Sequence, residues 1–347
     1  MEEFIKQILQ LLFVAITFGN YGLSQNEKTS LVGSTDYYEF YDDYWINLHH
    51  FLYQKAKGSQ KQKLEQDGNQ FSNIGETEAY KGLNTEQLNK LDTAIEYYKA
   101  HIVQKSLLRG LSKELVWLQK QEINQRILDI PFSKKYTEIL NQASEVYKTS
   151  FWPIHSKQNK LVLYEYLSII RRIENPVFSK MEKLSMDSIS SKKKIRVDLT
   201  AYANYAGAYT VTKPYFNIFL SSLDPNFKTT AFIETVFHEG SHLLFTYDSP
   251  FRGGIAKIFK KKGLEMGYPG HLWHASLFYL CGRVIQDELK EHDSIDHVLL
   301  MNQRNIFKSY NTVVFRESLE NYYKNKSDYE STIHRMLNHL NHKKVAD

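Results

Sequence analysis

The hydrophobic pattern of the chain changes its period near residue 190, and this change indicates the fold class. From about residue 84 to residue 183, apolar residues recur every three or four positions, which is typical of amphipathic helices. The clearest stretches lie at 111–128 and 161–173, and the prolines at 131, 153 and 176 are expected to punctuate them. Three short alternating segments come next, at Ile195–Leu199, Tyr205–Thr212 and Asn217–Ser221. A helical pattern returns at Thr229 and continues almost to the end.

This order predicts a mainly α protein of the α+β class, in which a small antiparallel sheet directly precedes a helix over 232–245. Residues 25–40 are polar and are expected to be loosely structured, Tyr41–Lys57 to be helical, and Gly58–Asn84 to form a surface loop. We expect an N-terminal helical region (25–190) and a second region (191–347) that together form one continuous domain.

Composition narrows the classes of partner and site. The 347 residues carry 24% charged and 42% apolar residues, which is ordinary for a globular protein. The net charge of +5 includes lysine runs at 192–194 and 260–262, but no interleaved aromatic or glycine-rich motif accompanies them, so we expect no nucleic-acid partner. Cys281 is the single cysteine, which excludes an internal disulfide and a multi-cysteine zinc site.

The N-terminus has the pattern of an export signal. Ile8–Leu23 is mostly apolar, and the small residues Gly22 and Ser24 have the spacing that a signal peptidase needs. We therefore predict a signal peptide over 1–24 and export to a bacterial periplasm or the outside of the cell. The apolar stretch is shorter than the roughly 20 residues of a full span, so stable membrane insertion is not expected. A retained anchor and a buried amphipathic helix remain the alternatives.

The segment His238–His242 reads HEGSH, an HExxH pattern. In a helix, positions i and i+4 lie one turn apart on one face, so the imidazoles of His238 and His242 can bind one Zn²⁺ while Glu239 lies beside them. Zinc chemistry of this kind lowers the pKa of a water to near 7, and a carboxylate takes its proton. The apolar residues of the helix fall on the opposite side of the wheel. The alternative is a helix whose histidines only pack in the core or face solvent.

A third zinc ligand is expected one helix downstream. On a helix over 271–289, His271 and His274 share a face with Phe278, Cys281 and Ile285. His274 is the preferred ligand because it lies inside the helix. His271 stands at the start of the helix and is an alternative ligand, or can instead polarise a substrate carbonyl. The acidic alternatives for the ligand are Asp248, Glu265 and Asp287.

A substrate-binding strand is expected just before the metal helix. The segment 202–209, YANYAGAY, has small residues at Ala206 and Gly207 that permit close backbone approach, while Asn204 and Tyr209 can supply hydrogen bonds. An ordinary strand pair with a bulge at Gly207 is an equal alternative. Further polar clusters, His49 with His50 and Trp152 with His155 and Asn159, can line a cleft but more often serve packing.

The run from Tyr202 to Leu244, together with LWHASLFYLCG at 272–282, resembles an uncharacterised group of exported bacterial HExxH-type zinc metallopeptidases. INLHHFLY (46–53) and FWPIHSKQN (151–159) extend the resemblance along most of the mature chain. The resemblance implies a zincin-like site with His238, His242 and His274 as ligands and Glu239 as base, but brings no substrate. One departure is Gly240, where such proteins more often carry a helix former; glycine there costs about 1 kcal/mol of helix stability.

These observations predict a zinc-dependent peptidase acting on a peptide or protein substrate, with Glu239 as base and then acid. His271 or Tyr279 is expected to stabilise the oxyanion. The alternatives are a zinc hydrolase of non-peptide amides, a metal-binding protein without turnover, and a structural helical protein. The sequence makes no prediction of oligomeric state.

Overall fold

The computed structural model describes most of the chain, namely residues 30–58, 74–123, 125–128, 131–189, 193–203, 207–224, 229–263 and 270–344. Residues 31–347 form one compact unit. The predicted signal peptide over 1–24 lies outside the described residues. Within the described part, no helix is both long and apolar enough to cross a membrane.

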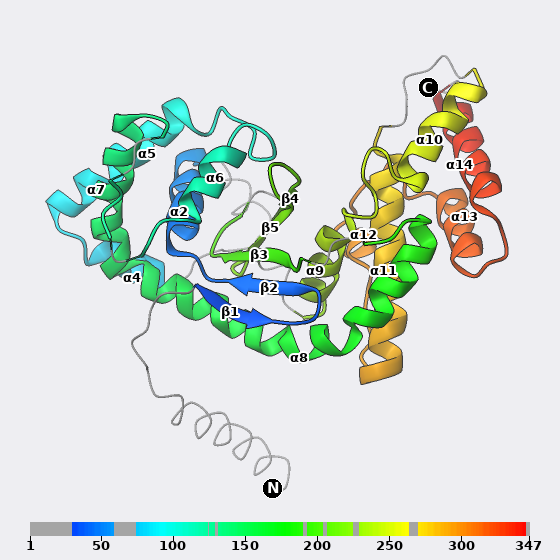
Figure 1. The fold of residues 1–347 in the computed structure, drawn as a ribbon, viewed down its shortest axis with the longest axis horizontal. Coiled ribbons are helices and arrows are strands. Elements are labelled where there is room, and N and C mark those ends of the chain that lie inside the picture. Colours follow the sequence, from blue (N-terminus) through cyan, green and yellow to red (C-terminus); the bar gives the residue numbers. More distant parts are fainter. Residues whose placement is uncertain are drawn as a thin grey trace, which may run out of the picture. The chain divides into compact units, whose positions relative to one another are not determined.

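A five-stranded sheet with the order β1-β2-β3-β5-β4 lies at the centre of this unit (Figure 1). Its strands are β1 (Leu31–Ser34), β2 (Tyr38–Tyr41), β3 (Ile195–Thr200), β4 (Ala208–Val211) and β5 (Asn217–Ser221). The outer pairs β1–β2 and β4–β5 are antiparallel, whereas β2–β3 and β3–β5 are parallel. The sheet is therefore mixed, and the prediction of an antiparallel sheet was wrong in this respect. Parallel neighbours need a long connection, and the helical region between β2 and β3 supplies one.

The first two strands correct a second expectation. Residues 25–40 were expected to be loose, but Leu31–Ser34 and Tyr38–Tyr41 pair with each other, and Tyr38 aligns with Ile195 of β3. Tyr38 and Phe40 are completely buried. Two inward-facing aromatic rings are enough to anchor so short a strand, although the surrounding segment is polar. Because β2 pairs with β3, the regions 25–190 and 191–347 share one sheet.

Helices cover both faces of the sheet (Figure 1). One face packs against α8 (Trp152–Ser185), α9 (Ala231–Ser241) and α11 (Leu272–Asp293) in one apolar core. The other face contributes Tyr209, Val211 and Phe219 to a second core that it shares with four helices, α2 (Tyr44–Lys57), α5 (Thr85–His101), α6 (Ser112–Leu118) and α7 (Lys134–Ser150). The sheet therefore separates two cores, and β4 is its edge strand beside α9.

The remaining described helices are α4 (Ile74–Lys81), α10 (Pro250–Lys261), α12 (Leu300–Gln303), α13 (Val313–Tyr323) and α14 (Tyr329–Lys344). The helix α4 falls in the stretch 58–84 that was predicted as a loop. The predicted helix over 111–128 is confined to Ser112–Leu118.

The predicted break at Pro176 does not occur, because α8 continues through it to Ser185. A proline inside a helix removes one backbone hydrogen bond and costs about 3 kcal/mol. Ile173, Val177 and Phe178, on either side of Pro176, are fully buried. Burial of large apolar side chains at about 1.5–3 kcal/mol each offsets that cost.

Candidate metal centre

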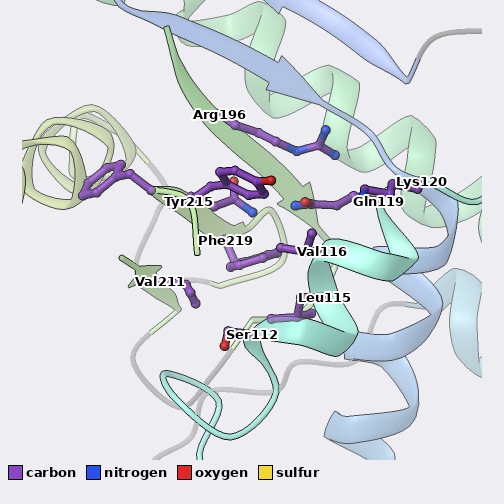
Figure 2. Close-up of a pocket in the computed structure, with 11 residues that line it drawn as sticks. Ser112, Leu115, Val116, Gln119, Lys120, Arg196, Val211, Tyr215 and Phe219 are labelled. Carbon is purple, nitrogen blue, oxygen red and sulfur yellow. The ribbon is translucent and has the colours of Figure 1, made fainter. Parts of the chain in front are cut away.

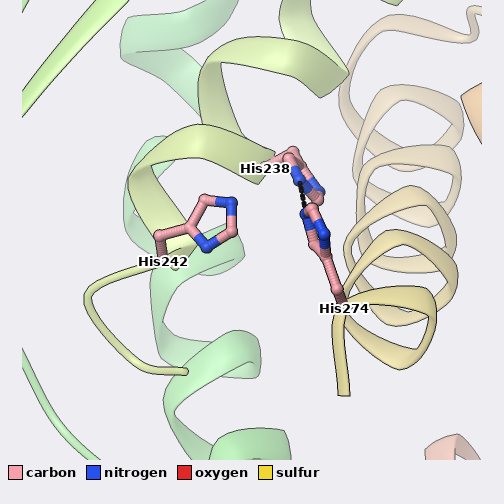
Figure 3. A group of neighbouring side chains, drawn as sticks. All are labelled: His238, His242 and His274. Carbon is pink, nitrogen blue, oxygen red and sulfur yellow. Dashed lines mark hydrogen bonds between the residues drawn. The ribbon is translucent and has the colours of Figure 1, made fainter. Parts of the chain in front are cut away.

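Three histidines meet where α9 packs against α11 (Figure 3). His238 and His242 come from the end of α9, and His274 comes from the first turn of α11. One ring nitrogen of each lies within 4.8 Å of the others, and the Nε2 atoms of His238 and His274 are 3.2 Å apart. In a tetrahedral site with Zn–N bonds of about 2.0–2.1 Å, ligand nitrogens stand about 3.3 Å apart. The His238–His274 spacing matches this value, and a ring nitrogen of His242 lies within 4.8 Å of both, so the donor set fits zinc.

The predicted helix over 232–245 is shorter in the structure. The α-helix ends at Ser241, and tighter turns continue it, with the N–H groups of His242, Leu243 and Leu244 donating to the carbonyls three residues earlier. His242 keeps right-handed helical backbone angles, so the one-turn spacing with His238 survives and their ring centroids are 5.1 Å apart.

The site holds its imidazoles in the neutral form. His238 is 2% exposed and stacks on Phe278, with ring centroids 3.7 Å apart. Burial, then the neighbouring histidines, lower the pKa of His238 well below its usual value. Burial, helped by the charge of Arg252, lowers the pKa of His242 to about 4. Burial also lowers the pKa of His274 strongly. A neutral imidazole is the form that binds a metal, so no proton has to leave near pH 7.

Glu239 lies beside the histidines. Its Oε2 is 3.8 Å from Nε2 of His242 and accepts a hydrogen bond of 2.5 Å from Oγ1 of Thr210. Burial raises the pKa of Glu239 to about 7, and the Thr210 hydrogen bond opposes this rise. The structure thus places a carboxyl group of near-neutral pKa beside His242.

Thr210 on β4 is a site residue that sequence reasoning missed. The strand alternates its faces, so Thr210 points to α9 while its neighbours Tyr209 and Val211 point to the opposite core. The expectation that Tyr209 binds substrate is not supported. Its ring is buried, and its hydroxyl is hydrogen-bonded at 2.8 Å to Nε2 of His50 on α2. Alternation within Ala208–Val211 was the available signal for Thr210.

The other residues predicted to bind substrate are Asn204, Ala206 and Gly207, and the structure describes Gly207 alone of these three. Asn204 and Ala206 lie outside the described residues. Gly207 has a positive φ of 83°, which favours glycine, and its carbonyl accepts a hydrogen bond of 2.8 Å from Ser221 N–H on β5. Gly207 therefore begins the β4–β5 pairing and offers its carbonyl to β5.

The two residues predicted to stabilise an oxyanion are placed differently. His271 caps α11 and is exposed, with its ring 6.0 Å from that of Phe307. Tyr279 is not brought to the histidines, because its hydroxyl donates to Glu320 on α13 at 3.0 Å. Tyr279 comes five residues after His274 on α11. At about 100° per residue, the two side chains point about 140° apart around the helix axis. This rotation is the physical reason that Tyr279 does not belong to the site.

Arg252 and Trp273 are further neighbours that the sequence did not indicate. The guanidinium carbon of Arg252 lies 4.0 Å above the Trp273 ring. That ring stacks on His274 at 4.9 Å and contacts His242 at 5.7 Å. Arg252 therefore brings a cation close to two of the histidines, held by a cation–π contact. The site predicted from the sequence contained no positively charged residue, and Arg252 supplies one.

Gly240 in the middle of HEGSH is explained by close packing. A Cβ at this position would fall on the hydroxyl of Tyr38 and would stand 3.3 Å from Cζ of Phe178. The same hydroxyl donates to the carbonyl of Val236 at 3.2 Å, which ties β2 to α9. Glycine thus lets α9 approach β2 and α8 closely.

We expect Gly240→Ala to lower the free energy of unfolding by about 1–3 kcal/mol, because overpacking outweighs the better helix propensity of alanine. Chemical denaturation measures this. Gly82→Ala is the matched control, since a Cβ there meets its nearest atoms at ordinary distances of 3.5 and 3.6 Å. Equal stability of Gly240→Ala and wild type would show that the packing is not tight.

A second group of potential ligands lies near the other end of α11, at Glu288, Glu291 and His292. Glu288 already pairs with Lys180 at 2.5 Å and with His292 at 3.2 Å. Glu291 and His292 are exposed. Because this group has partners of its own and weaker enclosure, its residues suit control variants and we propose no site there.

The polar clusters noted in the N-terminal half belong to the second core. His155 is completely buried between Glu76 and the hydroxyl of Tyr147, at 2.6 and 2.8 Å. His49 and His50 bond to Tyr98 and Tyr209. The side chains of these histidines are held by partners of the second core and are not among the three histidines that cluster between α9 and α11.

No protein-family model, curated protein or solved structure matches this chain. Any function proposed for the chain therefore rests on the geometry of its described residues.

Proposed function

We propose that this protein is a zinc-dependent hydrolase that cleaves peptide bonds. The observation that carries the proposal is the group His238, His242 and His274 with Glu239 beside it. Catalytic zinc sites use three protein ligands and one open position, and three neutral imidazoles are one such ligand set. When bound there, zinc supplies a water of low pKa and a Lewis acid for a carbonyl.

The residues of this chain have distinct roles in the proposed reaction. Oε2 of Glu239 takes a proton from the attacking water and then delivers it to the leaving amine. The hydroxyl of Thr210 holds that carboxylate in place through its hydrogen bond. Phe278, stacked on His238, and Trp273, stacked on His274, keep bulk water away from the imidazoles.

The position of β4 at the edge of the sheet favours an extended peptide as the substrate. Because Ser221 N–H donates to Gly207, strand alternation directs the backbone groups of Tyr209 and Val211 to β5 as well. The backbone groups of Ala208 and Thr210 then point away from β5, at the outer edge of the sheet that the described strands form. An extended peptide can pair with them as an added strand, beside Glu239.

A library of internally quenched peptides tests this proposal. The zinc-loaded full chain is expected to cleave a subset of the peptides, with new amine and carboxyl ends identified by mass spectrometry. Chelation is expected to abolish cleavage and added zinc to restore it. A zinc-loaded chain that cleaves no peptide would contradict the peptidase proposal.

Arg252 is proposed to stabilise the negative charge that develops on the substrate carbonyl. We expect Arg252→Gln to lower kcat/KM by about 10²–10³-fold, the usual cost of removing one such donor, without changing zinc content. Lys257→Gln is the control, because Lys257 is exposed on the same helix. Unchanged kcat/KM in Arg252→Gln would assign this role to another group.

A further inference from the structure

A cavity of about 270 Å³ between α6 and the sheet is separate from the metal centre (Figure 2). Its walls include Leu115 of α6 and Val211 and Phe219 of the sheet, which all belong to the second core. None of the three clustered histidines lines this cavity. The elements that cover the histidines therefore lie elsewhere, around the start of α11.

A loop at 304–312, between α12 and α13, brings one aromatic ring to the start of α11. The ring of Phe307 lies 5.1 Å from that of His274 and 6.0 Å from that of His271, measured between centroids. It also lies 5.8 Å from the ring of Phe278. Phe307 therefore packs against the turn of α11 that carries the proposed third zinc ligand.

Phe307 differs from the other rings around His274 in the element that holds it. Among the described residues, the other rings that contact His274 are those of His238 and His242 at the end of α9 and of Trp273 and Phe278 on α11. These four rings belong to the two elements that build the cluster. The ring of Phe307 comes from a separate loop, so it can move while the helices that carry the ligands stay in place.

The two ends of this loop are fixed. Before α12, Nε2 of His297 lies 2.6 Å from Oε2 of the buried Glu234 on α9, and the N–H of Leu300 donates to the same oxygen at 2.8 Å. At the far end, the hydroxyl of Tyr310 bonds to the backbone N–H of His271. Between these ties, the described backbone–backbone hydrogen bonds stay within the loop and its flanking helices. No residue of 304–312 is buried, so the middle of the loop can move between fixed ends.

The backbone of the loop is strained at the residue that carries the ring. Phe307 has a φ of 53°, in the left-handed region, which a bulky side chain rarely adopts. Such strain persists only where the surrounding contacts hold it, and here the ring contacts of Phe307 do so. Opening of the loop loses those contacts and relieves the strain. The two effects oppose each other, which brings the closed and open forms closer in free energy.

We propose that the loop 304–312 is a lid on the metal centre, and that the ring of Phe307 controls how fast zinc enters and leaves the three histidines. This inference rests on the proposed function and adds the element that controls access to its site. With the lid closed, Trp273, Phe278 and Phe307 enclose the imidazole of His274. A lid that closes equally over the free and the zinc-bound site changes both rates by one factor and leaves the affinity unchanged.

Stopped-flow measurement of zinc uptake, and of zinc release to an excess of chelator, tests the lid on the full chain. A closed lid that opens for about 0.1–10% of the time slows both rates, so Phe307→Gly should raise both by about tenfold or more and leave the affinity unchanged. Glycine adopts a φ of 53° freely, so this variant loses the ring without adding strain. Asn305→Gly is the matched control. Asn305 is exposed and has a φ of 51°, so the control relaxes the same loop, keeps the ring and should keep the wild-type rates.

Acylation of the metal-free chain by diethyl pyrocarbonate, located by mass spectrometry, tests the same lid without zinc. His274 is expected to react about tenfold faster or more in Phe307→Gly than in the wild type or Asn305→Gly. His155 reports on the fold, because it is completely buried and should stay protected in every variant. If His155 reacts in Phe307→Gly, the fold has opened. Phe307→Leu, which keeps an apolar side chain, then replaces that variant and should give a smaller increase at His274.

Equal zinc rates and equal acylation of His274 in wild type and Phe307→Gly would overturn the inference. Faster release with unchanged uptake would also overturn it, because the ring then positions His274 and does not control access. Equal effects of Asn305→Gly and Phe307→Gly would assign the change to the backbone and not to the ring. Failure of the proposed function looks different. A chain that binds no zinc still shows whether Phe307 protects His274 from acylation, and a chain that binds zinc but cleaves no peptide still gives both zinc rates.

Discussion

The Glu239→Gln variant is expected to bind zinc as the wild type does and to lose peptide hydrolysis by about 10²–10⁴-fold, the usual contribution of a general base. Glutamine keeps the size of the side chain and can still accept from Thr210, but its amide cannot take a proton from water near neutral pH. Glu239 is buried, and among the described residues it is the carboxylate beside His242 of the histidine cluster.

The measurement is kcat/KM on a cleaved library peptide together with zinc content. Glu291→Gln is the control, because Glu291 is exposed on α11. Activity that survives in Glu239→Gln at the wild-type level would remove Glu239 from the mechanism. Loss of zinc along with activity would show instead that the carboxylate is a ligand or holds the site together.

The His274→Ala variant is expected to lose zinc affinity by more than the roughly 10–100-fold that accompanies removal of a partner outside the ligand shell. His238 and His274 already have the nitrogen spacing of a zinc site, so this pair carries most of the preformed geometry. Truncating His274 leaves two ligands from one helix and exposes the site beside Trp273.

Competition with a zinc chelator of known affinity measures the loss. His271→Ala tests the residue three positions earlier and should keep wild-type affinity, since His271 is exposed and stands outside the group of three. His292→Ala controls for binding at the other end of α11. An affinity that falls in His271→Ala and not in His274→Ala would exchange the assignment of the third ligand.

Local periodicity predicted the core of the candidate site. The spacing of His238 and His242 implies one helix face, and the wheel of the next long helix favours His274. Both are properties of single helices, and single helices obey a fixed rotation per residue. The same rule excludes Tyr279 from the site once the angle from His274 is considered.

Contacts between distant segments were not predictable in this way. The hydrogen bond from Thr210 to Glu239 depends on which face of β4 packs on α9, and Arg252 reaches Trp273 across a helix-helix contact. The pairing of Tyr38 with Ile195 joins two parallel strands separated by a long helical region, and no local pattern encodes the direction of such a pair. The mixed sheet and the role of Gly240 beneath Tyr38 are consequences of that pairing.

Zinc content of the purified full chain, measured by elemental analysis after loading and removal of excess metal, tests the central claim most directly. We expect about one zinc per chain in the wild type and little in the His238→Ala/His242→Ala double variant, which keeps His292 and its neighbours. No zinc in the wild type, or equal zinc in both proteins, would show that the three histidines form a packing cluster and would contradict the proposed function.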